Sequence, residues 1–154
     1  MNTISELKSQ DFALAYAIEK VCHTHPWSEK TFLSNQGSRY LNYKISQNDQ
    51  IVGYCIIQIV LDEASLFNLA IHPKFQRQGL AKKLLSYALE QLSIRHISTI
   101  WLEVRASNQA AIRLYEQLGF NQFSVRENYY PTKDGQREDA LIMANTLFLT
   151  SKSE

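Results

Sequence analysis

The sequence of 154 residues has little cysteine, glycine or proline, and neither sign of charge dominates it. Its two cysteines, Cys22 and Cys55, lie far apart and form no Cys-x-x-Cys pair, so neither a disulfide scaffold nor a zinc ribbon is expected. The formal net charge is +1, which excludes a generally basic nucleic-acid binder. Hydrophobic residues make up 45% of the chain, which excludes an acidic, disordered tail protein.

Long apolar runs are also missing, since none reaches the roughly 18 residues that a membrane span needs. The first six residues contain no basic segment followed by an apolar one, so we expect no signal peptide. No repeat or linker interrupts the chain, and at about 150 residues per domain its length predicts one domain. We expect this domain over residues 1–148, followed by a short polar tail at 149–154. The expectation is a soluble, cytoplasmic protein, a monomer rather than an oligomer, that binds neither membrane nor nucleic acid.

Hydrophobic periodicity predicts two helices and about four strands in the first half of the chain. A strand is expected near residues 3–8, and a helix from Asp11 to about His23. A short helix begins at Ser28 and ends at Gly37. An antiparallel meander of about three strands then follows, at residues 40–46, 51–60 and 64–71.

The second half of the chain switches to longer helices. Leucines at helical spacing predict a helix over residues 79–94. A compact strand at 99–105 and a helix at 108–118 come next, then two strands near 121–127 and 139–148 joined by a longer loop. This order predicts an α/β fold, a single-domain mixed sheet of about seven strands with about four helices, which is parallel around the strand at 99–105.

The turn before the 79–94 helix is a candidate phosphate-binding segment, with the sequence Gln76-Arg77-Gln78-Gly79-Leu80-Ala81. A helix N-terminus offers free N–H groups and the positive end of the helix dipole. Gly79 lets a ligand approach the backbone, while Arg77 and Lys82 add positive charge. One glycine with two basic neighbours is a weak signal, however, and an ordinary turn into a surface helix explains it as well.

Glu103 is the candidate general base. Strand alternation places it on one face with Trp101 and Arg105, although glutamate is disfavoured in strands. A carboxylate in the middle of a central strand either pairs with a basic residue or faces a water-filled cleft. The functional interpretation is a base whose pKa is raised by partial burial. The alternative is a salt bridge to Arg105 or to a neighbouring strand.

Two residues of the 108–118 helix are further candidates. Tyr115 lies on its apolar stripe, where a tyrosine is most often part of the core. Its phenol could instead donate a proton to a leaving group beside a bound cofactor. Asn108, at the start of the helix, is more often a cap than a ligand contact.

The adjacent Tyr129 and Tyr130 precede Pro131 in the predicted long loop, where they suit an aromatic wall for a peptide-like ligand or a hydrophobic plug. The four histidines show no ligand spacing with each other or with the cysteines, so we predict no metal site. Cys55 lies in an apolar strand and is interpreted as a core residue.

These pieces occur together and in order, and they resemble the Gcn5-related N-acetyltransferase (GNAT) superfamily. The pattern Q/R-x-x-G-x-G/A is met at 76–81, with Ala81 an accepted variant of the second glycine. The strand at 68–73 and the helix segment at 108–120 fit as well. Further segments resemble the branch that acetylates the N-terminal alanine of a small-subunit ribosomal protein: Pro26-Trp27-Ser28, Trp101 to Arg105, Tyr129-Tyr130-Pro131 and Glu138-Asp139-Ala140.

The resemblance implies direct transfer of acetyl from acetyl-coenzyme A (acetyl-CoA) to an amine in a ternary complex, without a metal. Glu103 would be the base, acting through water, and Tyr115 the acid that protonates the departing thiolate. A backbone N–H near Leu69 would polarise the thioester carbonyl. The implied cofactor-binding residues are Leu69, Ala70, Ile71, Arg77, Gln78, Gly79, Leu80, Ala81, Lys82 and Asn108. The implied substrate-binding residues are Trp27, Tyr129, Tyr130 and Glu138.

The acceptor amine must be neutral to attack. An α-amino group with a pKa near 8 is roughly a tenth to a quarter neutral at about pH 7–7.5, whereas lysine at ~10.4 is almost fully charged. This favours an N-terminal acceptor, the N-terminus of a ribosomal protein by resemblance. Two alternatives stay open: a small-molecule amine as acceptor, or a non-catalytic module that binds acetyl-CoA.

Overall fold

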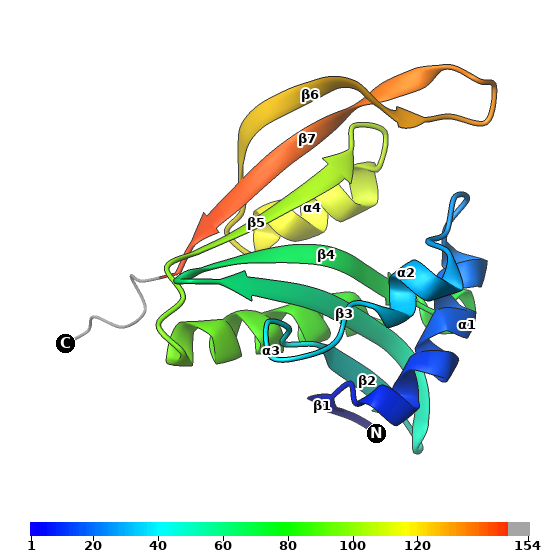
Figure 1. The fold of residues 1–154 in the computed structure, drawn as a ribbon, viewed down its shortest axis with the longest axis vertical. Helices are drawn as coiled ribbons and strands as arrows, with labels where there is room; N and C mark the ends of the chain where they lie inside the picture. The colour runs from blue at the N-terminus through cyan, green and yellow to red at the C-terminus, as the bar shows by residue number, and fades with distance from the viewer. Residues whose placement is uncertain (148–154) are drawn as a thin grey trace.

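The computed structural model describes residues 1–147, so the expected domain boundary at 148 and the tail at 149–154 lie outside the described residues. One twisted seven-stranded sheet runs through the molecule in the order β1-β2-β3-β4-β5-β7-β6 (Figure 1). Its strands are β1 (Asn2–Glu6), β2 (Tyr43–Gln47), β3 (Gln50–Val60), β4 (Glu63–Ile71), β5 (Thr99–Arg105), β6 (Asn121–Pro131) and β7 (Arg137–Thr146). The four α-helices described are α1 (Phe12–Cys22), α2 (Glu29–Leu33), α3 (Leu80–Ile94) and α4 (Gln109–Gln117).

The predicted element order and mixed sheet are confirmed, with β4 and β5 as the parallel pair. The strand expected at 40–46 begins later, at Tyr43, because Tyr40 forms only an isolated bridge to Gln58. The helix expected to reach Gly37 ends at Leu33. Its predicted cap is found, since the Ser28 side chain accepts a hydrogen bond from the Thr31 amide.

The prediction that the two tyrosines lie in a long loop is wrong. Tyr130 pairs with Glu138 across β6 and β7, so the hairpin loop covers only residues 132–136. A register shift between Arg126 and Tyr130, with Asn128 at φ +53°, is absorbed within β6. Asparagine tolerates this left-handed conformation. The amide of Asn128 donates to the carboxylate of Asp139 at 3.0 Å, which holds the irregularity in place.

Two apolar clusters fill the two faces of the sheet. The helices α1 and α2 cover one face with the cluster Leu7, Phe12, Ala15, Ile18, Phe32, Tyr54, Ile56 and Ala70. The larger cluster contains residues of α3 and α4, among them Leu84, Leu85 and Tyr115. Cys55 is fully buried in it, which confirms the interpretation of that residue as core. Burial raises the pKa of its thiol to about 12, so the thiol stays protonated.

The two central strands separate halfway along their length. Parallel pairing joins only residues 63–66 of β4 to residues 99–102 of β5. At this point the register between β3 and β4 shifts, because Ile57 pairs with Leu66 while Ile56 pairs with Asn68. Phe67 is therefore an extra residue, and such a bulge bends its strand. Beyond it, no strand of the described chain pairs with β4 on the β5 side.

Candidate active site

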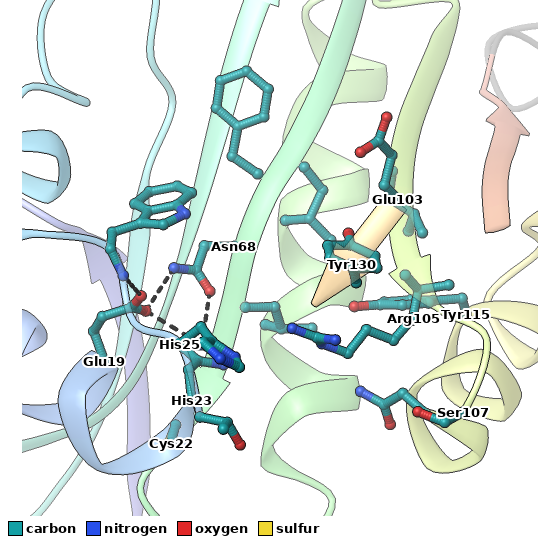
Figure 2. Close-up of a pocket in the computed structure, with 18 residues that line it drawn as sticks. Glu19, Cys22, His23, His25, Asn68, Glu103, Arg105, Ser107, Tyr115 and Tyr130 are labelled. Atoms are coloured by element: carbon teal, nitrogen blue, oxygen red, sulfur yellow. Dashed lines mark hydrogen bonds and ion pairs between the residues drawn. The ribbon is translucent and has the colours of Figure 1, made fainter. Parts of the chain in front are cut away.

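A cavity of about 460 Å³ lies where β4 and β5 separate; we refer to it as the central cavity. Residues 66–69 of β4, 102–105 of β5, the segment after α1 and the start of α4 line it. Figure 2 shows Glu19, His23 and Asn68 on one side, and Glu103, Arg105 and Tyr115 on the other. An adjoining cavity of about 570 Å³ shares several lining residues with it: Trp27, Leu66, Phe67, Leu102, Glu103 and Tyr130.

Strand alternation in β5 brings Glu103 to both cavities. Leu102 and Val104 are buried in the core, and Glu103 points to the opposite face, as the sequence predicts. Its Oε2 accepts a hydrogen bond from Nη1 of Arg126 at 2.7 Å, and the Glu103 side chain is 33% exposed. The alternative of a salt bridge is therefore realised, but with Arg126 of β6, which β7 separates from β5. The pairing with Arg105 is not formed, since Arg105 pairs with Glu138.

Tyr115 reaches the central cavity from α4. The residue is buried, and its ring packs against Phe120 with ring centroids 5.7 Å apart. Burial raises the pKa of the Tyr115 phenol to about 12, so the hydroxyl keeps its proton at neutral pH. Asn108 caps the same helix, because its Oδ1 accepts from the Ala111 amide at 3.2 Å. Asn108 lines the cavity as well, so capping and ligand contact are compatible at this position.

A buried carboxylate forms the wall opposite Tyr115. Glu19 is 1% exposed, and its two oxygens accept from the Tyr54 hydroxyl at 2.6 Å and from the Asn68 amide at 2.8 Å. They also accept from the Trp27 backbone N–H at 2.8 Å and from His23 Nε2 at 3.2 Å. Burial alone would raise the pKa of Glu19, but these hydrogen bonds outweigh it and lower the pKa to about 2.

The Glu19 cluster therefore fixes one wall of the cavity. It joins α1 to β3, to β4 and to the segment before α2, which carries Trp27. Trp27 lines both cavities. His23 stays between Glu19 and Asn68, and its hydrogen bond to Glu19 raises the pKa of its imidazole. Satisfying a buried carboxylate from several segments at once fixes their relative positions.

Two stacks of tyrosine, arginine and glutamate connect β5 to the β6–β7 hairpin. In one, the Arg126 guanidinium lies 4.1 Å from the centroid of the Tyr129 ring and binds Glu103. In the other, the Arg105 guanidinium lies 4.5 Å from the Tyr130 ring centroid and contacts Glu138 at 3.2 Å. The two tyrosine rings contact each other, with centroids 5.0 Å apart.

The segment at 76–81 has the geometry of an anion-binding helix start. Gly79 is the N-cap of α3 with φ +76°, and apart from the neighbouring backbone no atom lies within 4 Å of the position that a Cβ would occupy. The first helical hydrogen bond runs from Lys83 N–H to Gly79 O at 3.1 Å. The amides of residues 80–82 thus precede any intrahelical acceptor and are free for a phosphate. These features fit the pyrophosphate of a coenzyme.

Not all of the predicted site residues gather at the two cavities. The residues that line at least one of them are Trp27, Leu69, Glu103, Asn108, Tyr115, Tyr129 and Tyr130. The residues that line neither are Ala70, Ile71, Arg77, Gln78, Gly79, Leu80, Ala81, Lys82 and Glu138. Glu138 instead accepts hydrogen bonds from the Ser107 amide and hydroxyl and from Arg105. It therefore ties β7 to the turn before α4.

Sequence reasoning missed Glu19, Asn68 and Arg126 as members of the site. Glu19 carried a signal, because it continues the apolar stripe of its helix through Phe12 and Ala15, where a charge needs partners. Arg126 carried none, since its contact with Glu103 depends on the irregular register of β6.

Within residues 1–147, no group of three or more histidine, cysteine, aspartate or glutamate side chains is placed to hold a metal ion. None of the helices described is long and apolar enough to cross a membrane.

Comparison with known proteins places these features in a family. The profile of the acetyltransferase (GNAT) family matches residues 4–120, more than half of the chain. The chain belongs to the GNAT family. The prediction of an acyltransferase that depends on acetyl-CoA is thereby confirmed. The resemblance drawn from the segments at 68–73, 76–81 and 108–120 is confirmed with it.

Curated relatives in the family are similar over nearly the whole chain. The [ribosomal protein bS18]-alanine N-acetyltransferase of Escherichia coli (strain K12) is 58% identical over 94% of this chain and 97% of its own length. The protein of the same name from Haemophilus influenzae is 49% identical over 94% of this chain and 98% of its own length. The crystal structure of the ribosomal-protein-S18-alanine N-acetyltransferase from E. coli superposes with a TM-score of 0.95 at 55% identity, and covers 100% of this chain and 99% of that one.

Proposed function

We propose that this GNAT enzyme transfers the acetyl group of acetyl-CoA to the α-amine of the N-terminal alanine of ribosomal protein bS18. The observation that carries the proposal is that Glu103 and Tyr115 line one cavity, at the point where β4 and β5 separate. The relatives named for this reaction, which are 58% and 49% identical, support the choice of acceptor. A ribosomal acceptor also agrees with the cytoplasmic location expected from the sequence.

Three segments would hold acetyl-CoA: the start of α3, the end of β4 and the start of α4. The pyrophosphate would bind the amides of residues 77–82 at the start of α3. The pantetheine arm would pair with the backbone of residues 69–71, since no strand of the described chain occupies that side of β4. The amide of Asn108 would contact the same arm from α4. When bound, acetyl-CoA supplies a thioester whose carbonyl carbon the amine attacks.

Glu103 would accept the proton of the attacking amine, directly or through a water molecule. One of its oxygens, Oε2, is held by Arg126, and the other has no hydrogen-bond partner within the described residues. An α-amine with a pKa near 8 is already partly neutral at about pH 7. Glu103 therefore needs to remove a proton from a smaller fraction of acceptor molecules than it would with lysine. The backbone N–H near Leu69 would polarise the carbonyl under attack.

Tyr115 would donate its proton to the sulfur as the thiolate leaves. Its pKa of about 12 keeps the phenol protonated until that moment. Its burial excludes water that would otherwise compete as proton donor. Neither cysteine would act as a nucleophile. Cys55 is enclosed in the core. Cys22 lines the cavity, but its thiol donates to the Ile71 carbonyl at 3.1 Å, and burial raises the pKa of this thiol to about 11, so it stays protonated.

The acceptor would enter through the adjoining cavity. Trp27, Tyr129 and Tyr130 all line it. Aromatic side chains offer a broad apolar surface together with polar atoms, which suits a peptide backbone. The contact between Glu138 and the turn before α4 would maintain the shape of this wall.

The test is a transfer assay with three acceptors: a peptide carrying the N-terminus of mature bS18, the same peptide with its α-amine blocked, and a polyamine. Release of coenzyme A with the free peptide alone supports the proposal. Transfer to the polyamine but not to the peptide would establish a small-molecule acceptor. Tight binding of acetyl-CoA without transfer to any of the three would establish a non-catalytic module.

A further inference from the structure

The base of the proposed reaction is held by a residue from another strand. Arg126 lies on β6, and β7 separates β6 from the strand of Glu103. The contact between the two side chains is short, with 2.7 Å between Nη1 and Oε2. The Arg126 side chain is 48% exposed and the Glu103 side chain is 33% exposed, so neither is fixed by packing alone.

The aromatic ring of Tyr129 orients the Arg126 side chain. Its guanidinium lies 4.1 Å from the Tyr129 ring centroid, and a planar guanidinium stacks well on an aromatic face. The carbonyl of Tyr129 accepts a hydrogen bond from Arg137 at 2.9 Å, which fixes the backbone that carries the ring. The Tyr129 ring therefore orients the Arg126 guanidinium, which in turn holds the Glu103 carboxylate at the edge of the cavity.

The two arginines near Glu103 have different partners. Arg105, which lines the central cavity from β5, donates hydrogen bonds to Glu138 and to Pro131 O, the latter at 2.8 Å. It is therefore not placed to replace Arg126 at the Glu103 carboxylate. Within residues 1–147, Arg126 is the one basic side chain that bonds Glu103.

We propose that Arg126 is a positioning residue for Glu103, which holds Oε2 so that Oε1 faces the acceptor amine. This inference rests on the proposed function. Tyr129 then has a second task besides lining the acceptor cavity, since it supports the guanidinium. Without the arginine, the exposed Glu103 side chain samples several rotamers, and the fraction of molecules with an aligned base falls.

A double-mutant cycle tests this role, with Arg126→Met and Glu103→Gln made singly and together. In the wild-type background, Arg126→Met should lower kcat about tenfold, with the Kd of acetyl-CoA unchanged. In the Glu103→Gln background it should lower kcat by less than about twofold, because no base remains to be aligned. Arg126→Lys should restore only part of the loss, since an ammonium lacks the planar fork.

Lys133→Met is the matched control, since Lys133 is an exposed cation in the loop of the same hairpin and, within the described residues, pairs with none of Glu103, Arg126 and Tyr129. It should change kcat less than about twofold. An equal loss from Arg126→Met in both backgrounds, or no loss in either, would overturn the positioning role. If the wild-type enzyme transfers no acetyl to the bS18 peptide, the proposed function fails before the cycle begins, so the two failures are distinguishable.

Discussion

At the scale of single residues, environment separates the tasks of two groups in one cavity. Tyr115 is enclosed by core side chains, and its pKa of about 12 makes it a proton donor. The Glu103 side chain is one-third exposed, and Arg126 holds its Oε2, while its Oε1 has no hydrogen-bond partner within the described residues. The carboxylate is thus suited to accept the proton of the attacking amine, and the buried phenol is suited to donate a different proton to the departing thiolate.

Replacing Tyr115 with Phe removes the proton donor and keeps the ring that packs against Phe120. We expect kcat to fall about 10²-fold while the Kd of acetyl-CoA changes little, because the lost interaction belongs to the transition state. Steady-state kinetics and a binding titration measure the two quantities. The control is Tyr87→Phe, on α3 outside both cavities. A kcat equal to that of the wild type in Tyr115→Phe would show that Tyr115 is not the general acid.

Glu19 links acid stability to the wall of the cavity. Its pKa is lowered from 4.5 to about 2, so the native state gains stability from its ionised form above about pH 4.5. That contribution is lost as the pH falls from 4.5 toward 2. Glu19→Gln should therefore be less stable than wild type at pH 7, and the difference should narrow over that interval.

Urea unfolding of the two proteins across this pH range gives the comparison for Glu19. The control is Glu116→Gln, because Glu116 is exposed on α4. A difference between wild type and Glu19→Gln that stays constant with pH would contradict the assigned pKa. In that case the lower stability of Glu19→Gln would come from altered packing rather than from the lost carboxylate charge.

At the scale of elements, the sequence predicted the features that depend on neighbouring residues, such as the bounds of a strand and the caps of helices. The strand Thr99–Arg105 was predicted with its observed bounds, and the caps at Ser28 and Asn108 form as expected. Features that depend on pairing between strands were not predicted. The bulge at Phe67 opens the central cavity, yet nothing in its sequence marks it, because the shift is defined only by the partner strand β3.

The candidate site shows the same division. Glu103, Tyr115 and the glycine turn were predicted from residue type and spacing together with the family resemblance, and their catalytic and binding roles stay predictions. Arg126 was not, since it reaches Glu103 from a strand that is not adjacent to β5. The chemistry of each residue can therefore be predicted from the sequence. The register between strands that are distant in the sequence cannot, and it decides which side chains meet.

The start of α3 allows a test of the phosphate site through two glycines. Gly79 and Gly135 both have positive φ, and both have open space where a Cβ would stand. Replacing either with Ala should cost about 1 kcal/mol of stability, because the backbone conformation is strained in each. Only Gly79→Ala should also weaken acetyl-CoA binding, as measured by calorimetry. Equal affinity in both variants would contradict the role of residues 77–82.

At the scale of the whole molecule, the sheet connects both halves of the site. Glu19 of α1 and Trp27, just before α2, line the central cavity together with Glu103 of β5 and Tyr115 of α4. In Figure 1, α1 and α2 lie on one side of the sheet's split, and β5 and α4 lie on the other. The two halves meet through β3 and the first residues of β4 and β5. Ligands that bind between them should stabilise the fold as a unit.

Thermal unfolding should therefore show one transition, as expected for a single domain. Acetyl-CoA at about 100 times its Kd should stabilise the native state by about 2.7 kcal/mol and raise Tm. Scanning calorimetry with and without acetyl-CoA measures both effects. Two separate transitions would contradict the one-domain interpretation, and an unchanged Tm would contradict cofactor binding.

The most direct test of the account is the position of the acetyl group on a bS18 peptide that has both a free N-terminal alanine and an internal lysine. Fragmentation mass spectrometry after incubation with acetyl-CoA locates it, with Glu103→Gln run in parallel. We predict acetyl on the α-amine alone, and a strongly reduced yield with Glu103→Gln. Acetyl on the lysine, or an equal yield from both proteins, would contradict the account.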